Sequence, residues 1–480
     1  MEHTREAIPG MPFQHRATQP LRKYHLALTA ILAFCYILCK SLGSDAGAIA
    51  FFLLLSLNVI FSGVAQITCA MFFFTPLYLY VTVGTFPIYN VILLVLFLKR
   101  CFLERTKIPV YPVLAILLLA VIELSGMLVS GGVFSLNQAK FFLIILVTAM
   151  QLYHPPEGYD NRRGAKYLVC GTALFAVFYI SENFNSVLSS STRTGGLGDL
   201  DPNTYAMYNL FALSVILLFL LNRMLNKREA VLYCLIAGVL MLAGLMTLSK
   251  TFVLCTCLMF VLYCLASRRK AGVLIITSLL MGLIVLLIQY NGFMNGVYKT
   301  IVSRFTASSM MSGLTTGRSD IYTEFLAALC RNPLICFTGS GMYSYLQILG
   351  IEIRPHNCII EMICAWGIFG LGAVIYMYMK GKDSYKKRIQ YQGRVPLAGM
   401  IPLITLIVFM QSLTLMFEEA TYAYLCMAIM VMYNPTCAQN RPRWNTGDET
   451  NEKNALCDMV NGHRRGGTEP RQSAHDACRR

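Results

Sequence analysis

The sequence has few charged residues for its length. Asp, Glu, Lys and Arg make up 13% of 480 residues, whereas hydrophobic residues make up 56%. Soluble domains carry roughly 25% charged residues. Charge is rarest inside the long apolar runs, where Glu123 and Glu361 are exceptions. This shortage excludes an ordinary soluble domain and indicates a chain whose helices lie in a membrane.

The 17 cysteines lack the spacing of a metal set or of a disulfide framework. Most of them lie in apolar runs, where cysteine behaves as a small hydrophobic residue. Cys330 and Cys336 lie in a more polar segment, and either a disulfide between them or two free thiols fits that position. The cysteines therefore do not predict a CxxC metal site.

Long apolar runs set the fold class. A helix that crosses the hydrocarbon core needs about 20 mostly apolar residues, and continuous runs predict helices rather than barrel strands. We expect an all-α polytopic integral membrane protein with about fourteen transmembrane helices, within a range of about twelve to fourteen. The expected helices are 24–40, 46–63, 66–83, 85–99, 109–130, 138–153, 164–182, 204–222, 228–247, 250–266, 271–289, 355–379, 396–414 and 416–433. The run 85–99 is short for a crossing, and its pairing with 66–83 is the least regular feature.

The net charge of +16 follows this topology. Most Lys and Arg residues alternate onto one side of the expected crossings, as the positive-inside rule requires, so the surplus does not indicate nucleic-acid binding. Both termini are then cytoplasmic, and the first helix is expected to be retained because no small-residue cleavage site follows it. We expect a cytoplasmic N-terminus (1–23), N-terminal helices (24–182) and an external loop (183–203). Further helices (204–289), a large external loop (290–354), C-terminal helices (355–433) and a disordered cytoplasmic tail (434–480) follow.

The large external loop is rich in aromatic and aliphatic residues, so we expect it to fold as a cap on the outer membrane surface. Ile321, Phe325 and Leu329 recur at helical spacing. Ser319 is the expected N-cap of this helix, and Pro333 is expected to end it.

One histidine out of seven, His356, is expected on the outer side. Pro355 suits the first turn of the helix that follows. Because the positive end of that helix disfavours an imidazolium ion, we expect a neutral imidazole that can act as a general base. The alternative interpretation is an interfacial histidine that only caps the helix.

Three external cations are candidates for binding an anion. Arg318 stands before the amphipathic helix, where a guanidinium and helix N–H groups together suit a phosphate, although a solvated loop arginine fits equally. Lys250 lies in a tight apolar hairpin and either extends to the membrane surface or binds an anion there. Arg193 is the third, in a small polar loop.

The same loop contains Asp199-Leu200-Asp201, the DxD pattern with which many nucleotide-sugar transferases hold a metal. It faces away from the cytoplasm, where nucleotide sugars are found. Asp201 followed by proline has the form of an N-cap and first turn, so we interpret it as a helix start.

Two stretches resemble the O-antigen ligase and polymerase family of bacterial polysaccharide assembly. They read GRSDIYTEFLAALCRNPLICFTGSGMYSYL and RPHNCIIEMICAWGIFGLG, within 317–370. Weaker similarity lies upstream in RTGGLGDLDPN and in TLSK, where the family commonly has Ser-Arg. The resemblance covers about 190–380; before 180 the chain is similar only in hydropathy.

The resemblance implies a metal-independent glycosyltransferase that uses a glycan joined through diphosphate to a polyprenol lipid. It implies that Arg318, Lys250 and Arg193 bind the diphosphate and that His356 is the general base. It implies no metal and no cofactor. Asn357, Glu361 and Tyr322 are candidate contacts to the acceptor sugar, although for Glu361 a structural hydrogen bond to a neighbouring helix is the favoured interpretation. Lys250 departs from the family pattern, since lysine keeps the charge but lacks the bidentate fork of arginine.

The expected function is therefore polymerisation of lipid-linked oligosaccharide units for an O-antigen, capsule or exopolysaccharide, on the outer face of the bacterial cytoplasmic membrane. One alternative is the ligase, which passes a finished glycan to lipid A-core or another acceptor. The other is a transporter or flippase of the lipid-linked glycan. The expected partners are the glycan donor, its acceptor, membrane lipid and other polysaccharide-assembly proteins.

Overall fold

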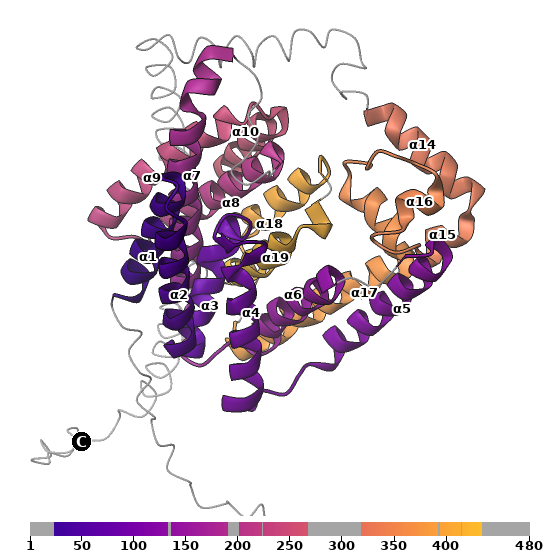
Figure 1. Ribbon diagram of the computed structural model, residues 1–480, viewed down its shortest axis with the longest axis horizontal. Coiled ribbons are helices and arrows are strands. Elements are labelled where there is room, and N and C mark those ends of the chain that lie inside the picture. The colour runs from indigo at the N-terminus through magenta and orange to yellow at the C-terminus, as the bar shows by residue number, and fades with distance from the viewer. Residues whose placement is uncertain are drawn as a thin grey trace, which may run out of the picture. The chain divides into compact units, whose positions relative to one another are not determined.

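A computed structural model describes residues 24–132, 136–190, 201–222, 224–266, 318–391, 394–413 and 415–433. These residues are almost entirely helical, and Figure 1 shows the arrangement of the helices. The one sheet among them is a two-residue antiparallel ribbon that joins two helices. Helices predominate because backbone groups in a membrane must find their hydrogen-bond partners within the segment.

The first four helices form two hairpins. α1 (His25–Ser41) packs along α2 (Asp45–Phe61), and α3 (Val64–Phe74) packs along α4 (Ile88–Leu98). The predicted helix 66–83 is too long, because α3 passes into a short 3-10 turn, η1 (Thr75–Leu77), at a proline. The ribbon β1 (Thr82–Val83) and β2 (Phe86–Pro87) then reverses the chain.

The next helices differ in how much of their surface other helices cover. They are α5 (Val110–Ser130), α6 (Leu136–Tyr153), α7 (Asn161–Ser190), α8 (Pro202–Leu221), α9 (Lys227–Met246) and α10 (Lys250–Ala266). In α8, 89% of the most apolar window is buried, against 33% in α5. α8 is therefore central, between α7, α9, α10 and α18 (Leu397–Met410), whereas α5 leaves much apolar surface for lipid.

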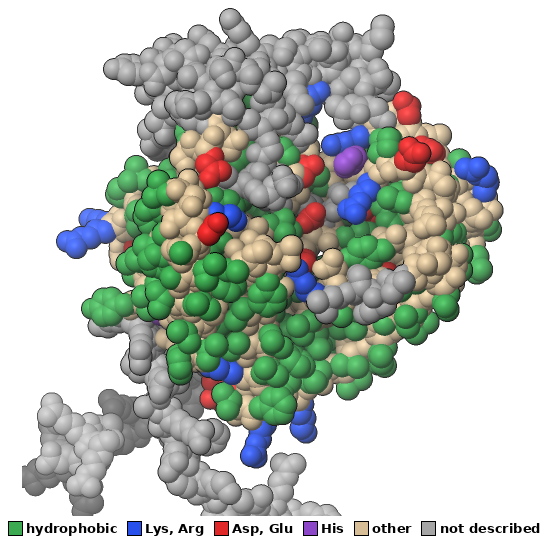
Figure 2. Space-filling view, in the orientation of Figure 1, with side chains coloured by type: hydrophobic (Ala, Val, Ile, Leu, Met, Phe, Trp, Pro, Cys, Tyr) green, Lys and Arg blue, Asp and Glu red, His purple; other side chains and the backbone are tan. Residues whose placement is uncertain are grey.

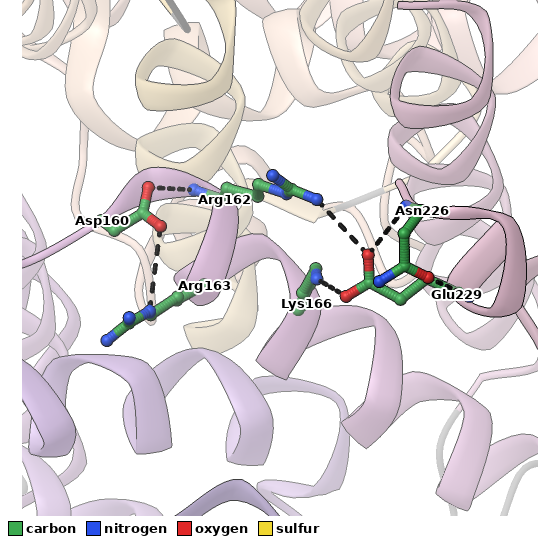
Figure 3. A network of polar contacts seen from close by, with 6 residues as sticks. All are labelled: Asp160, Arg162, Arg163, Lys166, Asn226 and Glu229. Carbon is green, nitrogen blue, oxygen red and sulfur yellow. Dashed lines mark hydrogen bonds and ion pairs between the residues drawn. The ribbon is translucent and has the colours of Figure 1, made fainter. Parts of the chain in front are cut away.

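An ionic network fixes the start of α9 to α7, as Figure 3 shows. Asn226 is the N-cap of α9 and closes a capping box with Glu229. The Glu229 carboxylate also pairs with Lys166 and lies 3.4 Å from Arg162 of α7. Both carboxylate oxygens are thereby occupied, so this network is a structural joint.

The described part of the segment 290–354, residues 318–354, contains short helices. They are α14 (Arg318–Arg331), α15 (Pro333–Thr338) and α16 (Tyr345–Leu349), beside the end of α5 and the start of α17 (Figure 1). Phe325 and Leu329 of α14 are buried. Ser319 is not an N-cap, because it lies inside α14 and its hydroxyl donates to Asp320. α14 ends at Arg331, just before Pro333, as predicted, and Pro333 also opens α15.

Three further helices complete the described fold: α17 (Cys358–Arg388), α18 (Leu397–Met410) and α19 (Glu419–Met432). α17 packs against α5, α6 and α15, and α18 packs against α8, α10 and α19. Most residues of α19 are fully buried, so α19 lies inside the bundle with α8.

The chain is an all-α membrane protein. Five of the described helices are long and apolar enough to cross a membrane, and shorter apolar helices of 10–17 residues accompany them. Each predicted crossing within the described residues contains a helix. The predicted crossing 271–289, the Arg193 loop and the tail 434–480 lie outside the described residues.

Candidate functional site

The start of α17 fixes the position of His356. The N-cap is Asn357, whose side-chain oxygen accepts from the N–H groups of Ile359 and Ile360 at 3.0 and 3.2 Å. Its amide nitrogen donates to the carbonyl of Gln411, which ends α18, at 3.3 Å. The prediction that Pro355 lies in the first turn is wrong, because the asparagine side chain starts the helix two residues later.

His356 has a left-handed backbone, with φ of 49°. This conformation is uncommon for a residue with a side chain and costs on the order of 1–3 kcal/mol. It persists because the side chain of the next residue, Asn357, is fixed by its hydrogen bonds to the first turn of α17 and to the carbonyl at the end of α18. The half-buried His356 is therefore placed by the backbone on each side of it.

α17 is broken nine residues after its start. Gly367 has φ of 65° and ψ of 178°, which interrupts the helical hydrogen bonds. The freed carbonyl of Ala365 accepts from the N–H of Gly341 at 2.7 Å, and that of Cys364 accepts from the hydroxyl of Ser340 at 2.9 Å. The segment after α15 thus supplies the partners that a broken membrane helix requires.

Glu123 of α5 binds both the segment after α15 and α17 at this break. Its carboxylate accepts from the N–H of Met342 at 2.6 Å, from the indole of Trp366 at 3.0 Å and from the amide of Gln138 at 3.2 Å. Both oxygens are occupied and the side chain is 1% exposed. The sequence offered no role for Glu123, and the structure assigns it a structural one.

Glu361 lies one turn into α17 and is 0% exposed. One oxygen accepts from the hydroxyl of Tyr345 in α16 at 2.9 Å, so a hydrogen bond to a neighbouring helix is confirmed. The other oxygen, Oε2, has no hydrogen-bond partner among the described residues. Burial and the adjacent carboxylate raise the pKa of Tyr345, so its phenol remains a donor.

A second carboxylate, which sequence reasoning did not assign, lies near the first. Glu418, the N-cap residue of α19, accepts from the hydroxyl of Tyr78 at 2.5 Å. Arg354 acts electrostatically on both Glu361 and Glu418. Arg354 is an exposed cation two residues before His356, whereas Glu361 is buried and Glu418 is half-buried.

An ion pair continues this polar region. Glu419 lies 2.6 Å from Lys140 of α6, and its other oxygen has no hydrogen-bond partner within the described chain. Asp201 also acts electrostatically on Glu418. In Figure 2, side chains of both charges and a histidine gather around a hollow in the face shown, whereas hydrophobic side chains dominate elsewhere on it.

The predicted cations are joined to this region through their helices. Arg318 is the half-buried first residue of α14, and Tyr322 lies one turn later. Phe325 of the same helix packs on Tyr345, with ring centroids 6.4 Å apart. Lys250 is the first residue of α10, which packs against α18, the helix that holds Asn357. Arg193 lies outside the described residues.

Two smaller predictions are settled. Asp201 is the N-cap of α8 and accepts from the N–H of Asn203 at 2.6 Å, which confirms the helix-start interpretation. Cys330 and Cys336 are free thiols. Within the described residues, no group of three or more His, Cys, Asp or Glu side chains is arranged to hold a metal ion.

Sequence reasoning missed Arg354, Glu418, Glu419, Lys140 and Tyr78. Arg354 was visible as the basic residue two positions before His356. Glu418 and Glu419 were visible as charges at the edge of an apolar run, a position that ordinarily indicates only a helix end. Nothing in the sequence brings Tyr78 or Lys140 to them, because those contacts span more than 270 residues.

No protein-family description, curated protein or solved structure matches this chain.

Proposed function

We propose that this chain is a metal-independent membrane glycosyltransferase. It polymerises oligosaccharide units that are linked through diphosphate to a polyprenol lipid, for a surface polysaccharide. The observation that carries the proposal is the backbone of His356, held in a left-handed conformation two residues after Arg354 and five residues before the buried Glu361. Residues in such conformations concentrate at active sites, where the surrounding structure holds them in place.

The proposed reaction joins two lipid-linked units. An acceptor hydroxyl attacks the anomeric carbon of the donor, its proton passes to His356, and the bond from that carbon to the diphosphate breaks. The lipid diphosphate leaves with its negative charge stabilised by Arg318, Lys250 and Arg193. Direct attack inverts the anomeric centre, and a product with retained configuration would reject this route.

The carboxylates suit the acceptor. The unpartnered oxygen of Glu361 can accept from a sugar hydroxyl, with Tyr345 fixing the rotamer through the other oxygen. Tyr322 remains a candidate sugar contact on α14. Asn357 is assigned a positioning role, because its side chain already binds two N–H groups and the Gln411 carbonyl. Arg354 is added as a cation of the site.

The proposed topology has about fourteen crossings with both termini in the cytoplasm. The start of α17 and the helices α14–α16 then lie on the outer side of a bacterial cytoplasmic membrane. A site at that depth is open to a donor whose polyprenol chain remains in the bilayer.

The decisive experiment is glycan assembly in the native host with His356→Ala. We expect a loss of polymer of at least about 100-fold, the typical contribution of a general base, with single lipid-linked units accumulating. Membrane abundance should be unchanged. Glu352→Ala, which alters an exposed charge on the same connection, is the matched control and should assemble normal polymer. Unchanged glycan in His356→Ala would overturn the proposal.

A ligase differs only in the acceptor, which would be lipid A-core or another molecule. In that case the same variant accumulates long lipid-linked chains instead of single units.

A transporter of the lipid-linked glycan is the second candidate, favoured by the break in α17 and by the buried carboxylate of Glu361 and the half-buried ones of Glu418 and Glu419. Purified protein in liposomes discriminates between the two. An enzyme lengthens or transfers the glycan without a gradient, whereas a transporter changes only its side of the membrane.

A further inference from the structure

An exposed aromatic cluster lies where α5 meets the second half of α17. Tyr111, in the first turn of α5, packs edge-on against Tyr376 of α17, with ring centroids 5.5 Å apart. The ring of Tyr153 in α6 lies 6.5 Å from the Tyr111 ring on another side. Tyr111 and Tyr376 are 42% and 48% exposed, so a molecule outside the protein can contact both rings. Each tyrosine combines an apolar ring with a hydroxyl donor, which suits the boundary between hydrocarbon and water.

A cation lies beside this cluster. The ammonium nitrogen of Lys380, one turn after Tyr376, lies 5.2 Å from the centroid of the Tyr376 ring. Asp383 is the acidic residue nearest to Lys380 in the sequence, and it lies 3.9 Å from Lys382. Within the described residues Lys380 itself forms no ion pair. A half-buried positive charge without a counter-ion in the described chain therefore lies beside two exposed phenols.

An exposed apolar strip leads to the cluster on the same side of both helices. Phe369, Tyr376 and Lys380 occupy positions i, i+7 and i+11 of α17, which fall within about 40° of one another around a helix. In α5, Leu118 likewise follows Tyr111 by seven residues, so these two share a face. Phe369 and Leu118 are 59% and 37% exposed. Both helices therefore turn this strip outward from the protein.

The two helices remain packed together along the strip, and they run side by side (Figure 1). Leu119 of α5 lies against Gly370 of α17, about two turns away from the pair of tyrosines. Leu118 and Phe369 are the chain neighbours of these two residues, so they lie at the same level of the strip. From Phe369 to Lys380 the helix rises about 16 Å, close to the roughly 15 Å depth of one leaflet. An acyl chain lying along the strip would thus bring its headgroup to Lys380.

We propose that this strip binds an anionic phospholipid, with its phosphate on Lys380 and Tyr376 and an acyl chain along Leu118 and Phe369. The ammonium group binds a phosphate as a point charge, and the phenol hydroxyl can donate to it. Because Lys380 has no counter-ion in the described chain, a headgroup with net negative charge is favoured over a zwitterionic one.

The lipid reaches this site directly from the bilayer. Each contacting side chain is exposed or half-buried, and all of them lie on one side of the contact between α5 and α17. In the proposed topology this end of α17 lies at the cytoplasmic surface of the membrane, where basic residues between helices bind lipid headgroups. The site is independent of the glycan chemistry proposed for the other end of α17.

The test uses the purified full chain in neutral detergent, with bound lipid counted by native mass spectrometry. Long-chain phosphatidylglycerol, short-chain phosphatidylglycerol, long-chain phosphatidylcholine and inorganic phosphate are titrated separately. We expect long-chain phosphatidylglycerol to bind most tightly and to raise the unfolding temperature. The short-chain lipid has the same headgroup without the full apolar contact, and inorganic phosphate has no apolar part, so both should bind more weakly.

Lys380→Gln should weaken the binding of long-chain phosphatidylglycerol by at least about fivefold, the contribution of one cation at a membrane surface. Tyr376→Phe keeps the ring and removes the hydroxyl, and it should weaken binding by about two- to tenfold. Lys386→Gln is the matched control. It removes the same charge six residues later and about 120° around the helix, and binding should be unchanged. The unfolding temperature of each lipid-free variant should equal that of wild type, because these side chains are partly exposed.

Three results would overturn the proposal. They are unchanged binding in Lys380→Gln, equal weakening by Lys386→Gln, and equal binding of phosphatidylcholine, short-chain phosphatidylglycerol or inorganic phosphate. The first removes the site, the second reduces it to general surface charge, and the third removes either the anionic headgroup or the acyl contact.

Discussion

The starts of α9 and α17 use the same signal and reach different results. Each helix has an asparagine N-cap, Asn226 or Asn357, followed by an acidic residue in its first turn. Glu229 comes three residues after its cap and closes the capping box. Glu361 comes four residues after its cap, so it is rotated by about 100° around the helix. It cannot close the box and instead enters the protein interior.

Because of this difference, Glu229 has a structural role whereas Glu361 is a candidate site residue. Both oxygens of Glu229 are bound by its own cap and by cations of α7. Glu361 has one oxygen bound and one without a partner among the described residues. Glu123, which is as buried as Glu361, has both oxygens occupied. An incompletely satisfied buried carboxylate is costly, so its retention favours a role in binding.

The largest expected effect concerns Glu123, whose carboxylate oxygens both accept hydrogen bonds. Glu123→Ala removes the carboxylate acceptor of three buried donors and should destabilise the fold by about 3–4 kcal/mol. The measurement is the unfolding temperature and the folded yield in detergent. Glu123→Gln keeps one acceptor and should fall between wild type and alanine. Wild-type stability in Glu123→Ala would contradict the structural role.

Glu361 should behave in the opposite way. Glu361→Gln keeps the shape of the side chain and an acceptor for Tyr345, so the unfolding temperature should change little. The open position then carries an amide N–H2 donor in place of a carboxyl oxygen, and the loss of this acceptor for a sugar hydroxyl should lower glycan transfer by about 10- to 100-fold. The comparison fails if Glu361→Gln is as active as wild type, or if it loses stability and activity together.

Glu229 gives the matching control at the other helix start. Its side chain is 29% exposed, so Glu229→Gln should cost only about 0–1 kcal/mol and leave glycan transfer unchanged. The effect should shrink as salt is added. Thermal unfolding at low and high ionic strength measures it, and a loss of transfer would remove the distinction between the two carboxylates.

The smallest expected effect is a pH dependence at the end of α6. Burial, with the charges of Arg388 and Arg100, lowers the pKa of His154 from its ordinary value of 6.5. The unfolded chain then binds the proton more readily, so stability should fall as pH drops below 6.5. His154→Gln should flatten this part of the unfolding profile. An identical profile in the variant would contradict the assignment.

Several features could be predicted from the sequence. The apolar runs located the helices, and the Asp201-Pro202 pair located the start of α8. The spacing of Phe325 and Leu329 located the buried face of α14. The ends of helices were predicted less well where side chains competed for the cap. Pro355 and Ser319 both suit a helix start, but Asn357 starts α17 and Ser319 lies inside α14.

The candidate site was predicted only in part. His356, Asn357 and Glu361 are close in the sequence, so a pattern of six residues includes them. The break at Gly367 could not be predicted, because glycines are common in membrane helices and most of them leave the helix intact. It is set by the segment after α15, which binds the freed carbonyl groups.

The sequence by itself determined that this chain is helical and lies in a membrane, because long apolar runs cannot be dissolved in water and cannot leave backbone groups unpaired in lipid. It also determined where most helices lie, because each long apolar run must form a helix in the membrane. The tertiary structure alone decided which carboxylates have both oxygens hydrogen-bonded and which keep one oxygen without a partner among the described residues. Contacts such as Tyr78 with Glu418 and Lys140 with Glu419 join distant segments, and no local pattern encodes such distances.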